Sequence, residues 1–255
     1  MMTLNQDGRN RVIKTSLFAV FILAGFSCAQ GSEGEKLDIK LVGEISANTY
    51  DAFKIELEKS PKAQQVTVSS QGGSALVAMA IGRLIKNRKM RVKVEGYCVS
   101  SCANYIFIAG EDKVITRNSL VVFHGGLQQE GLLDQTLSGT YEQSAKSNAY
   151  NDQDTPQYIM DLFGLEKSDS LEEELNALVK IEQEYFEEMG VSNELPTYGQ
   201  KGDYKEICDS GMYFGFYYDL DSLKNMGVKN VSVEGGRWEP DENMHFDKVY
   251  HVNFP

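Results

Sequence analysis

Residues 96–110 read GYCVSSCANYIFIAG, so that two adjacent serines lie between two cysteines, with a glycine before them and an apolar run behind them. The apolar run from Ala103 to Ala109 is typical of a buried helix. A serine at the turn between a strand and such a helix exposes its Oγ, and the free N–H groups of the first helical turn point into the same space. Three interpretations follow: a turn that presents a nucleophile, a disulfide staple, or a polar bend before a buried helix.

The sequence around this stretch alternates between strand-like and helix-like patterns. Strands are expected at residues 37–42, 65–70, 90–94, 113–116 and 120–123, and helices at 46–59 and 74–87. We expect the second strand to break at Gly72-Gly73 and the third to end at Gly96. Strands that alternate with helices of this length form βαβ units, so the pattern predicts an α/β fold with a mainly parallel sheet.

The second half of the chain has a different character. Residues 127–190 are polar, acidic and helix-prone, and Leu171 to Met189 forms an amphipathic pattern that should end at Gly190. Residues 196–218 are predicted to be irregular, and the tail from Arg237 gives no periodic signal. A short helix over 220–226 and a strand over 228–233 are also expected.

The N-terminus carries the features of an export signal. Basic residues precede an apolar run over 17–26, and the small residues Ser27 and Ala29 flank Cys28. This pattern predicts a signal peptide over 1–29, a single domain over 30–255, and a periplasmic or secreted protein. A lipoprotein signal acylated at Cys28 and an uncleaved anchor are the alternatives. No later segment is apolar for long enough to span a membrane.

Charge and composition exclude several classes of function. A chain of 255 residues can bury a large core, and its net charge of −12 argues against binding to nucleic acid. The three histidines and the cysteines do not reach metal-ligand spacing, so neither a metal nor a cofactor is expected. Cys98 and Cys102 are close enough for a disulfide, which would mainly fix local shape.

Four short motifs occur in a recognisable order: SQGG at 70–73, GYCVS at 96–100, AG at 109–110 and FH at 123–124. This order and spacing resemble the Clp-type serine protease family within the crotonase-like superfamily, well over residues 37–126 and loosely over 185–233. The C-x-S-S-C variant is similar to an exported bacterial branch of that family. The resemblance implies a ClpP/crotonase-like fold of stacked ββα units, here with a helical acidic insertion over 127–190.

The resemblance also implies roles for particular residues. Ser100 would be the nucleophile and His124, 24 positions later, its base. Gly73 and Ser101 would donate N–H groups to the oxyanion. Ser101 is the alternative nucleophile. The alternatives without catalysis are purely structural roles: a helix N-cap at Ser100, a structural histidine at 124 and a tight turn at Gly72-Gly73.

The third member of a triad is where this chain departs from the family pattern. The family places an aspartate about twelve residues before a late glycine–aliphatic pair, and here that count falls on Gly215. Asp209 is preferred as the acid, with Asp219 and Asp203 as the alternatives. A Ser–His dyad or an inactive site would follow if none of them reaches His124.

These residues predict an exported serine peptidase that acts by acyl transfer on peptides or unfolded proteins. Because exported compartments lack ATP, no ATPase partner is expected, and the relatives suggest a homo-oligomer. The alternative is an inactive crotonase-like binding or scaffold protein that uses residues 127–190 as its interaction surface. Acyl-thioester chemistry is a weaker third interpretation, because coenzyme A is cytosolic.

Overall fold

The structure is a computed structural model that describes residues 37–132, 134, 155–168, 170–238 and 246–255. The chain divides into two units after Glu33, and all of the described residues belong to the second unit. The predicted signal peptide over 1–29 lies outside the described residues, as do residues 135–154 of the acidic segment.

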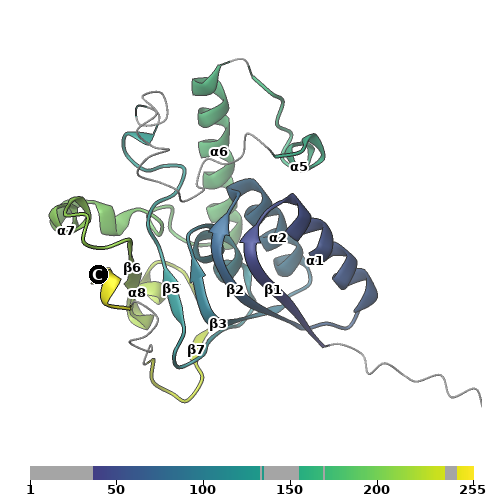
Figure 1. The fold of residues 1–255 in the computed structure, drawn as a ribbon, viewed down its shortest axis with the longest axis horizontal. Helices are drawn as coiled ribbons and strands as arrows, with labels where there is room; N and C mark the ends of the chain where they lie inside the picture. The colour runs from purple at the N-terminus through teal and green to yellow at the C-terminus, as the bar shows by residue number, and fades with distance from the viewer. Residues whose placement is uncertain (1–36, 133, 135–154, 169, 239–245) are drawn as a thin grey trace, which may run out of the picture. The chain divides into compact units, whose positions relative to one another are not determined.

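A six-stranded sheet organises the fold (Figure 1). Its strands are β1 (Asp38–Ile45), β2 (Gln65–Gly73), β3 (Arg91–Val99), β4 (Lys113–Ile115), β5 (Leu120–Val122) and β7 (Val231–Val233). The strand order is β1-β2-β3-β4-β7, β5 also pairs with β3, and each of these ladders is parallel. The predicted α/β class with a mainly parallel sheet is confirmed.

Helices connect the successive strands. They are α1 (Ala47–Lys59), α2 (Ala75–Asn87) and the π-helix η1 (Cys102–Phe107). Because β1 to β4 follow one another in a single direction, right-handed crossovers put these connections on one face of the sheet. The buried side chains of α2 and the fully buried η1 fill the space between the layers.

Two expected strand ends are wrong. β3 continues through Gly96 to Val99, and Tyr97, Cys98 and Val99 pair with β5. Gly96 stays in the strand with a φ of +90°, and its N–H donates to Ser119 Oγ at 2.9 Å. β2 likewise runs through Gly72 to Gly73, which pairs with Ile45 of β1. The chain therefore turns at Ser100 itself rather than over residues 96–100.

β1 lies at one end of the strand order. Its register with β2 shifts between Val42 and Glu44, where Gly43 has a φ of +92°. This irregularity is a β-bulge, which bends a strand and interrupts its ladder.

The acidic segment contributes α5 (Gln157–Asp161) and α6 (Leu171–Met189). The predicted helix over 171–189 is confirmed, with the Ser170 hydroxyl capping its start and Gly190 ending it in the left-handed conformation. Tyr185 of α6 donates its hydroxyl to the Tyr105 carbonyl of η1 at 2.6 Å. A Cβ on Gly82 of α2 would collide with that same hydroxyl, so the glycine at this position allows α6 to pack closely against α2.

The C-terminal part contains short elements that the sequence did not predict. They are η3 (Tyr198–Gln200), η4 (Gly202–Tyr204), α7 (Lys205–Asp209), β6 (Gly215–Tyr218), η6 (Phe246–Lys248) and β8 (Val249–Val252), beside the expected helix α8 (Leu220–Asn225). β6 and β8 pair in parallel as a second sheet, so the expectation of irregular structure over 196–218 is wrong there. A bridge between Phe123 and Phe216 joins this sheet to the end of β5. Within the described part of the chain, none of the helices is both long and apolar enough to cross a membrane.

Candidate active site

Ser100 occupies the single residue between β3 and the helical segment that begins at Ser101. Its φ is +57°, in the left-handed region that a non-glycine side chain rarely adopts. The Ser100 N–H donates to the Val122 carbonyl at 3.0 Å, and the Ser100 carbonyl accepts from the Asn104 N–H at 2.8 Å. Strained backbone of this kind persists only where the surroundings hold it, and it is concentrated at functional sites.

Gly72 packs directly against the Ser100 turn. A Cβ on Gly72 would lie 2.7 Å from Ser100 Cβ and 2.9 Å from the Val99 carbonyl oxygen. The φ of Gly72 is +102°, which also favours glycine. Sequence reasoning assigned a role to Gly73 and none to Gly72, although the pair of glycines was the available signal.

Gly73 and Ser101, the two predicted oxyanion donors, are bonded to each other. The Ser101 hydroxyl donates to the Gly73 carbonyl at 2.8 Å, and both groups are buried. A Cβ on Gly73 would lie 2.1 Å from the Ile45 carbonyl oxygen, so the close approach of β1 requires glycine there. With its hydroxyl committed to Gly73, Ser101 is less suited than Ser100 to act as a nucleophile. The role of their N–H groups toward an oxyanion stays a prediction.

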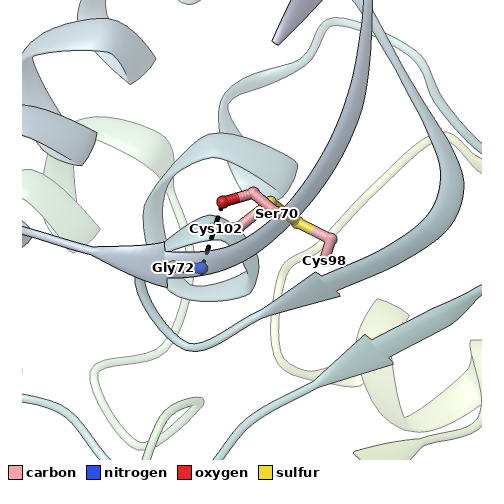
Figure 2. Close-up of a disulfide and its surroundings, with 4 residues drawn as sticks. All are labelled: Ser70, Gly72, Cys98 and Cys102. Carbon is pink, nitrogen blue, oxygen red and sulfur yellow. Dashed lines mark hydrogen bonds between the residues drawn. A yellow bond between two sulfur atoms is a disulfide. The ribbon is translucent and has the colours of Figure 1, made fainter. Parts of the chain in front are cut away.

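A disulfide joins Cys98 and Cys102, with an S–S distance of 2.03 Å (Figure 2). Cys98 is on β3 and Cys102 begins η1, so the covalent loop encloses Ser100. The bridge lies beside the end of β2, where Ser70 Oγ accepts from the Gly72 N–H at 3.0 Å (Figure 2). Both cysteines are fully buried. The bridge thus fastens the strand to the helix across the turn.

His124 follows β5, the strand that pairs with the end of β3. Because Val99 is in register with Val122, the chain brings His124 to the same edge of the sheet as Ser100. Burial lowers the pKa of the His124 imidazole below its ordinary value, which favours the neutral, basic form at pH 7. Both residues are described by the structure, and no hydrogen bond joins the Ser100 hydroxyl to the His124 ring.

The predicted acids lie in other surroundings. Asp209, in α7, is 62% exposed and forms an ion pair of 3.2 Å with Lys205 Nζ. Asp219 caps α8 through the Ser222 N–H at 2.7 Å and lies 3.5 Å from His251 Nε2. Asp203 is exposed in η4. Over the described ranges, no carboxylate is hydrogen-bonded or ion-paired to His124, so Asp209 as the third triad member stays a prediction.

A buried carboxylate lies beneath the turn that follows His124. Glu182 of α6 is fully buried and accepts hydrogen bonds from the Tyr105 hydroxyl at 2.5 Å, the Leu127 N–H at 3.1 Å and Gln128 Nε2 at 3.1 Å. Burial raises the pKa of the Glu182 carboxyl. Sequence reasoning gave this residue no role, although a charged residue on the apolar face of the predicted helix was a usable signal.

Comparisons with known proteins give matches to solved structures at low identity. No protein-family model and no curated protein matches the chain. Among solved structures, the chain is similar to ClpP1 from Listeria monocytogenes, with 14% identity, 81% of this chain and 94% of that chain covered, and a TM-score of 0.40. A point mutant of the same ClpP1 is 15% identical to this chain, with 82% of this chain and 94% of that chain covered, and has a TM-score of 0.42.

The catalytic domain of the ClpP protease from Plasmodium falciparum gives 15% identity, covers 77% of this chain and 85% of that chain, and has a TM-score of 0.42. The fold class rests on the parallel strand pairing of the six-stranded sheet. Across the described residues, no group of three or more histidine, cysteine or acidic side chains is arranged to hold a metal ion.

Proposed function

We propose that this protein is an exported serine hydrolase of the Clp-protease type, acting on peptides or unfolded proteins without an ATPase partner. The observation that carries the proposal is the left-handed backbone of Ser100 at a strand-to-helix turn, beside the parallel strand that leads to His124. Nucleophile turns in unrelated hydrolases also place a serine on a strained strand-to-helix connection. Export, taken from the N-terminal pattern, and a homo-oligomer are parts of the same proposal.

The chemistry assigns one task to each residue. His124, whose lowered pKa favours the neutral form, accepts the proton as Ser100 Oγ attacks the acyl carbon of the substrate. The oxygen of that carbonyl becomes an oxyanion, which backbone N–H groups at Ser101 and Gly73 would stabilise. His124 then returns the proton to the leaving amine, and water hydrolyses the acyl-enzyme by the same steps.

The test is covalent labelling of the full-length protein with a fluorophosphonate. We expect labelling of the wild type and of Ser232→Ala, because Ser232 is an exposed serine in β7 that this chemistry does not use. Labelling should be lost in Ser100→Ala and should fall by about 100-fold or more in His124→Ala, the usual share of a general base. Equal labelling of Ser100→Ala and wild type would contradict the assignment of Ser100.

A second candidate is a binding protein that keeps this fold without catalysis. Two observations favour it: Ser100 is only 4% exposed, and the candidate acids Asp209 and Asp219 are paired with Lys205 and His251 rather than with His124. This candidate predicts a folded wild-type protein that the probe does not label at any pH from about 5 to about 9, the range over which a histidine base titrates. The labelling experiment therefore decides between the two functions.

A further inference from the structure

Backbone groups around His124 are held from four directions. The Phe123 N–H and carbonyl exchange hydrogen bonds of 2.8 and 2.7 Å with Phe216 of β6. The His124 carbonyl accepts from Gln200 Nε2 at 2.9 Å, and the Gly125 carbonyl accepts from Asn104 Nδ2 at 2.8 Å. Further along, the Leu127 N–H donates to Glu182. The backbone of the candidate base is therefore fixed even though no described carboxylate is bonded to its ring.

The turn after His124 depends on glycine. Gly125 has a φ of +126°, and a Cβ there would lie 2.1 Å from Gln129 Oε1 and 3.2 Å from Gln200 Nε2. Side-chain amides thus occupy the space that a larger residue would need. The two amides that donate to the His124 and Gly125 carbonyls, those of Gln200 and Asn104, are called the amide clamp below.

Asn104 differs from Gln200 because it bonds both halves of the site. It is 2% exposed and lies in η1, four residues after Ser100. Its backbone N–H donates to the Ser100 carbonyl at 2.8 Å, while its side chain donates to Gly125 at the same distance. One residue therefore links the backbone of the candidate nucleophile to the backbone that follows the candidate base.

The other amide atom of Asn104 supports a role beyond packing. Its Oδ1 is buried and lacks a hydrogen-bond partner within the described part of the chain. A buried acceptor without a partner costs stability, and an apolar side chain of similar shape would avoid that cost. An asparagine at this position is therefore explained by its Nδ2 donor, which forms the hydrogen bond to the Gly125 carbonyl.

We propose that Asn104 is a positioning residue that fixes His124 relative to Ser100 through the Gly125 and Ser100 backbones, with Gln200 as the second arm of the clamp. The inference rests on the proposed function, since it deepens the account of the same site. The base is oriented through its main chain, and the correct placement of a reacting group by about an ångström affects rate by about 100-fold.

The test compares Asn104→Leu and Gln200→Ala with Asn193→Leu, all in the full-length protein. Asn193 is the matched control, because its Oδ1 is also buried without a partner among the described residues and its side chain has no bond to the His124 turn. Two quantities are measured: the rate of fluorophosphonate labelling from about pH 5 to about pH 9, and the titration of the His124 ring by NMR. The three histidines of the chain make that assignment tractable.

We expect Asn104→Leu to lower the labelling rate by about 10- to 100-fold. The pH at which the labelling rate reaches half of its maximum should rise, because a released ring is less buried and the pKa of His124 returns toward its ordinary value. Gln200→Ala should show the same changes to a smaller degree, and Asn193→Leu neither. Glu182, the buried acid bonded to the same turn, is unchanged in all three variants and so does not account for a difference between them.

Each result decides the proposal. Unchanged rates and an unchanged His124 titration in Asn104→Leu and Gln200→Ala would overturn it. If Asn104→Leu does not fold, Gln200→Ala alone decides. If the wild type is not labelled, the proposed function fails, and the NMR titration still decides the clamp: a shifted His124 midpoint in the clamp variants supports it, and identical midpoints overturn it.

Discussion

The Ser101 hydroxyl donates a hydrogen bond of 2.8 Å to the Gly73 carbonyl oxygen, and so ties the first residue after the Ser100 turn to the end of β2. The two serines of the C-x-S-S-C stretch therefore have different environments. Ser101 is a structural link between two segments that are 28 residues apart, whereas Ser100 has the left-handed backbone.

Replacing Ser101 with alanine should separate these roles. The variant loses one buried hydrogen bond and leaves the Gly73 carbonyl unpaired, so the free energy of unfolding should fall by about 1–2 kcal/mol. A fluorophosphonate adduct should still form on Ser100 and be located there by peptide mass spectrometry. An adduct that forms in Ser100→Ala and disappears in Ser101→Ala would show that Ser101 is the nucleophile.

Gly72→Ala should disrupt the Ser100 turn. The new Cβ would lie 2.7 Å from Ser100 Cβ, in addition to the backbone strain at a φ of +102°. Gly164→Ala is the control, because Gly164 has a φ of +65° and open space around it. Urea unfolding should show a loss of about 1 kcal/mol for Gly164→Ala and about 2 kcal/mol more for Gly72→Ala. Equal losses would mean that the turn yields to the extra methyl group.

The Cys98–Cys102 disulfide should matter more for labelling than for overall stability. A bridge with a sequence separation of 4 constrains the unfolded chain little, so reduction should lower the free energy of unfolding by only about 2 kcal/mol. Reduction should also lower the labelling rate, because the bridge joins the residues on both sides of Ser100 and so holds the turn in place. Measurements in a Cys208→Ser background remove the free cysteine of the described residues, and equal labelling of oxidised and reduced protein would contradict the prediction.

Labelling should depend on pH through His124. Burial lowers the pKa of its imidazole, so the rate should rise with pH through a midpoint below about 6.5 and then stay level to about pH 8. The free energy of unfolding should also rise with pH over that window, since the unfolded histidine binds a proton that the folded one has released. His124→Gln should remove that component, whereas Glu182, with its raised pKa, acts in the opposite direction.

Lys113 should add a stability change at alkaline pH. Its ammonium is buried against the Gly110 and Lys229 carbonyls, at 2.6 and 3.0 Å, and burial lowers the pKa of Lys113 to about 8. Above that pH the neutral amine still donates hydrogen bonds to both carbonyls, while the lysine of the unfolded chain stays charged to about pH 10.5. Stability should therefore rise by about 2 kcal/mol between about pH 8 and about pH 9.5, and Lys113→Met should lack this rise in urea titrations.

The sequence predicts the main sheet well because its strands and helices repeat with clear periods. The helix over 171–189 is confirmed at both ends, where a serine and a glycine give unambiguous cap signals. The strands β6 and β8 were not predicted, because each is only four residues long and the two are separated by about thirty residues of chain. No local pattern records such a distant partner.

The site is less predictable than the fold. The motif spacing selected Ser100 and His124, and strand pairing brings both to one edge of the sheet. The expected strand end at Gly96 was wrong because a glycine with positive φ can remain inside a strand when the neighbouring strand, here β2, pairs with residues on both sides of it, Val94 and Cys98. The roles of Gly72 and Asn104 depend on contacts between segments that no spacing rule encodes.

The bulge in β1 has a consequence for behaviour in concentrated solution. A strand at the margin of a sheet offers unpaired backbone groups to other molecules, and Val42 there is 67% exposed. The interruption at Gly43, with exposed Lys40 and Glu44 on either side of it, prevents a long continuous ladder from forming. We expect the folded protein to resist growth into fibrils, and light scattering of a variant that straightens this strand by deleting Gly43 would measure how much protection the bulge provides.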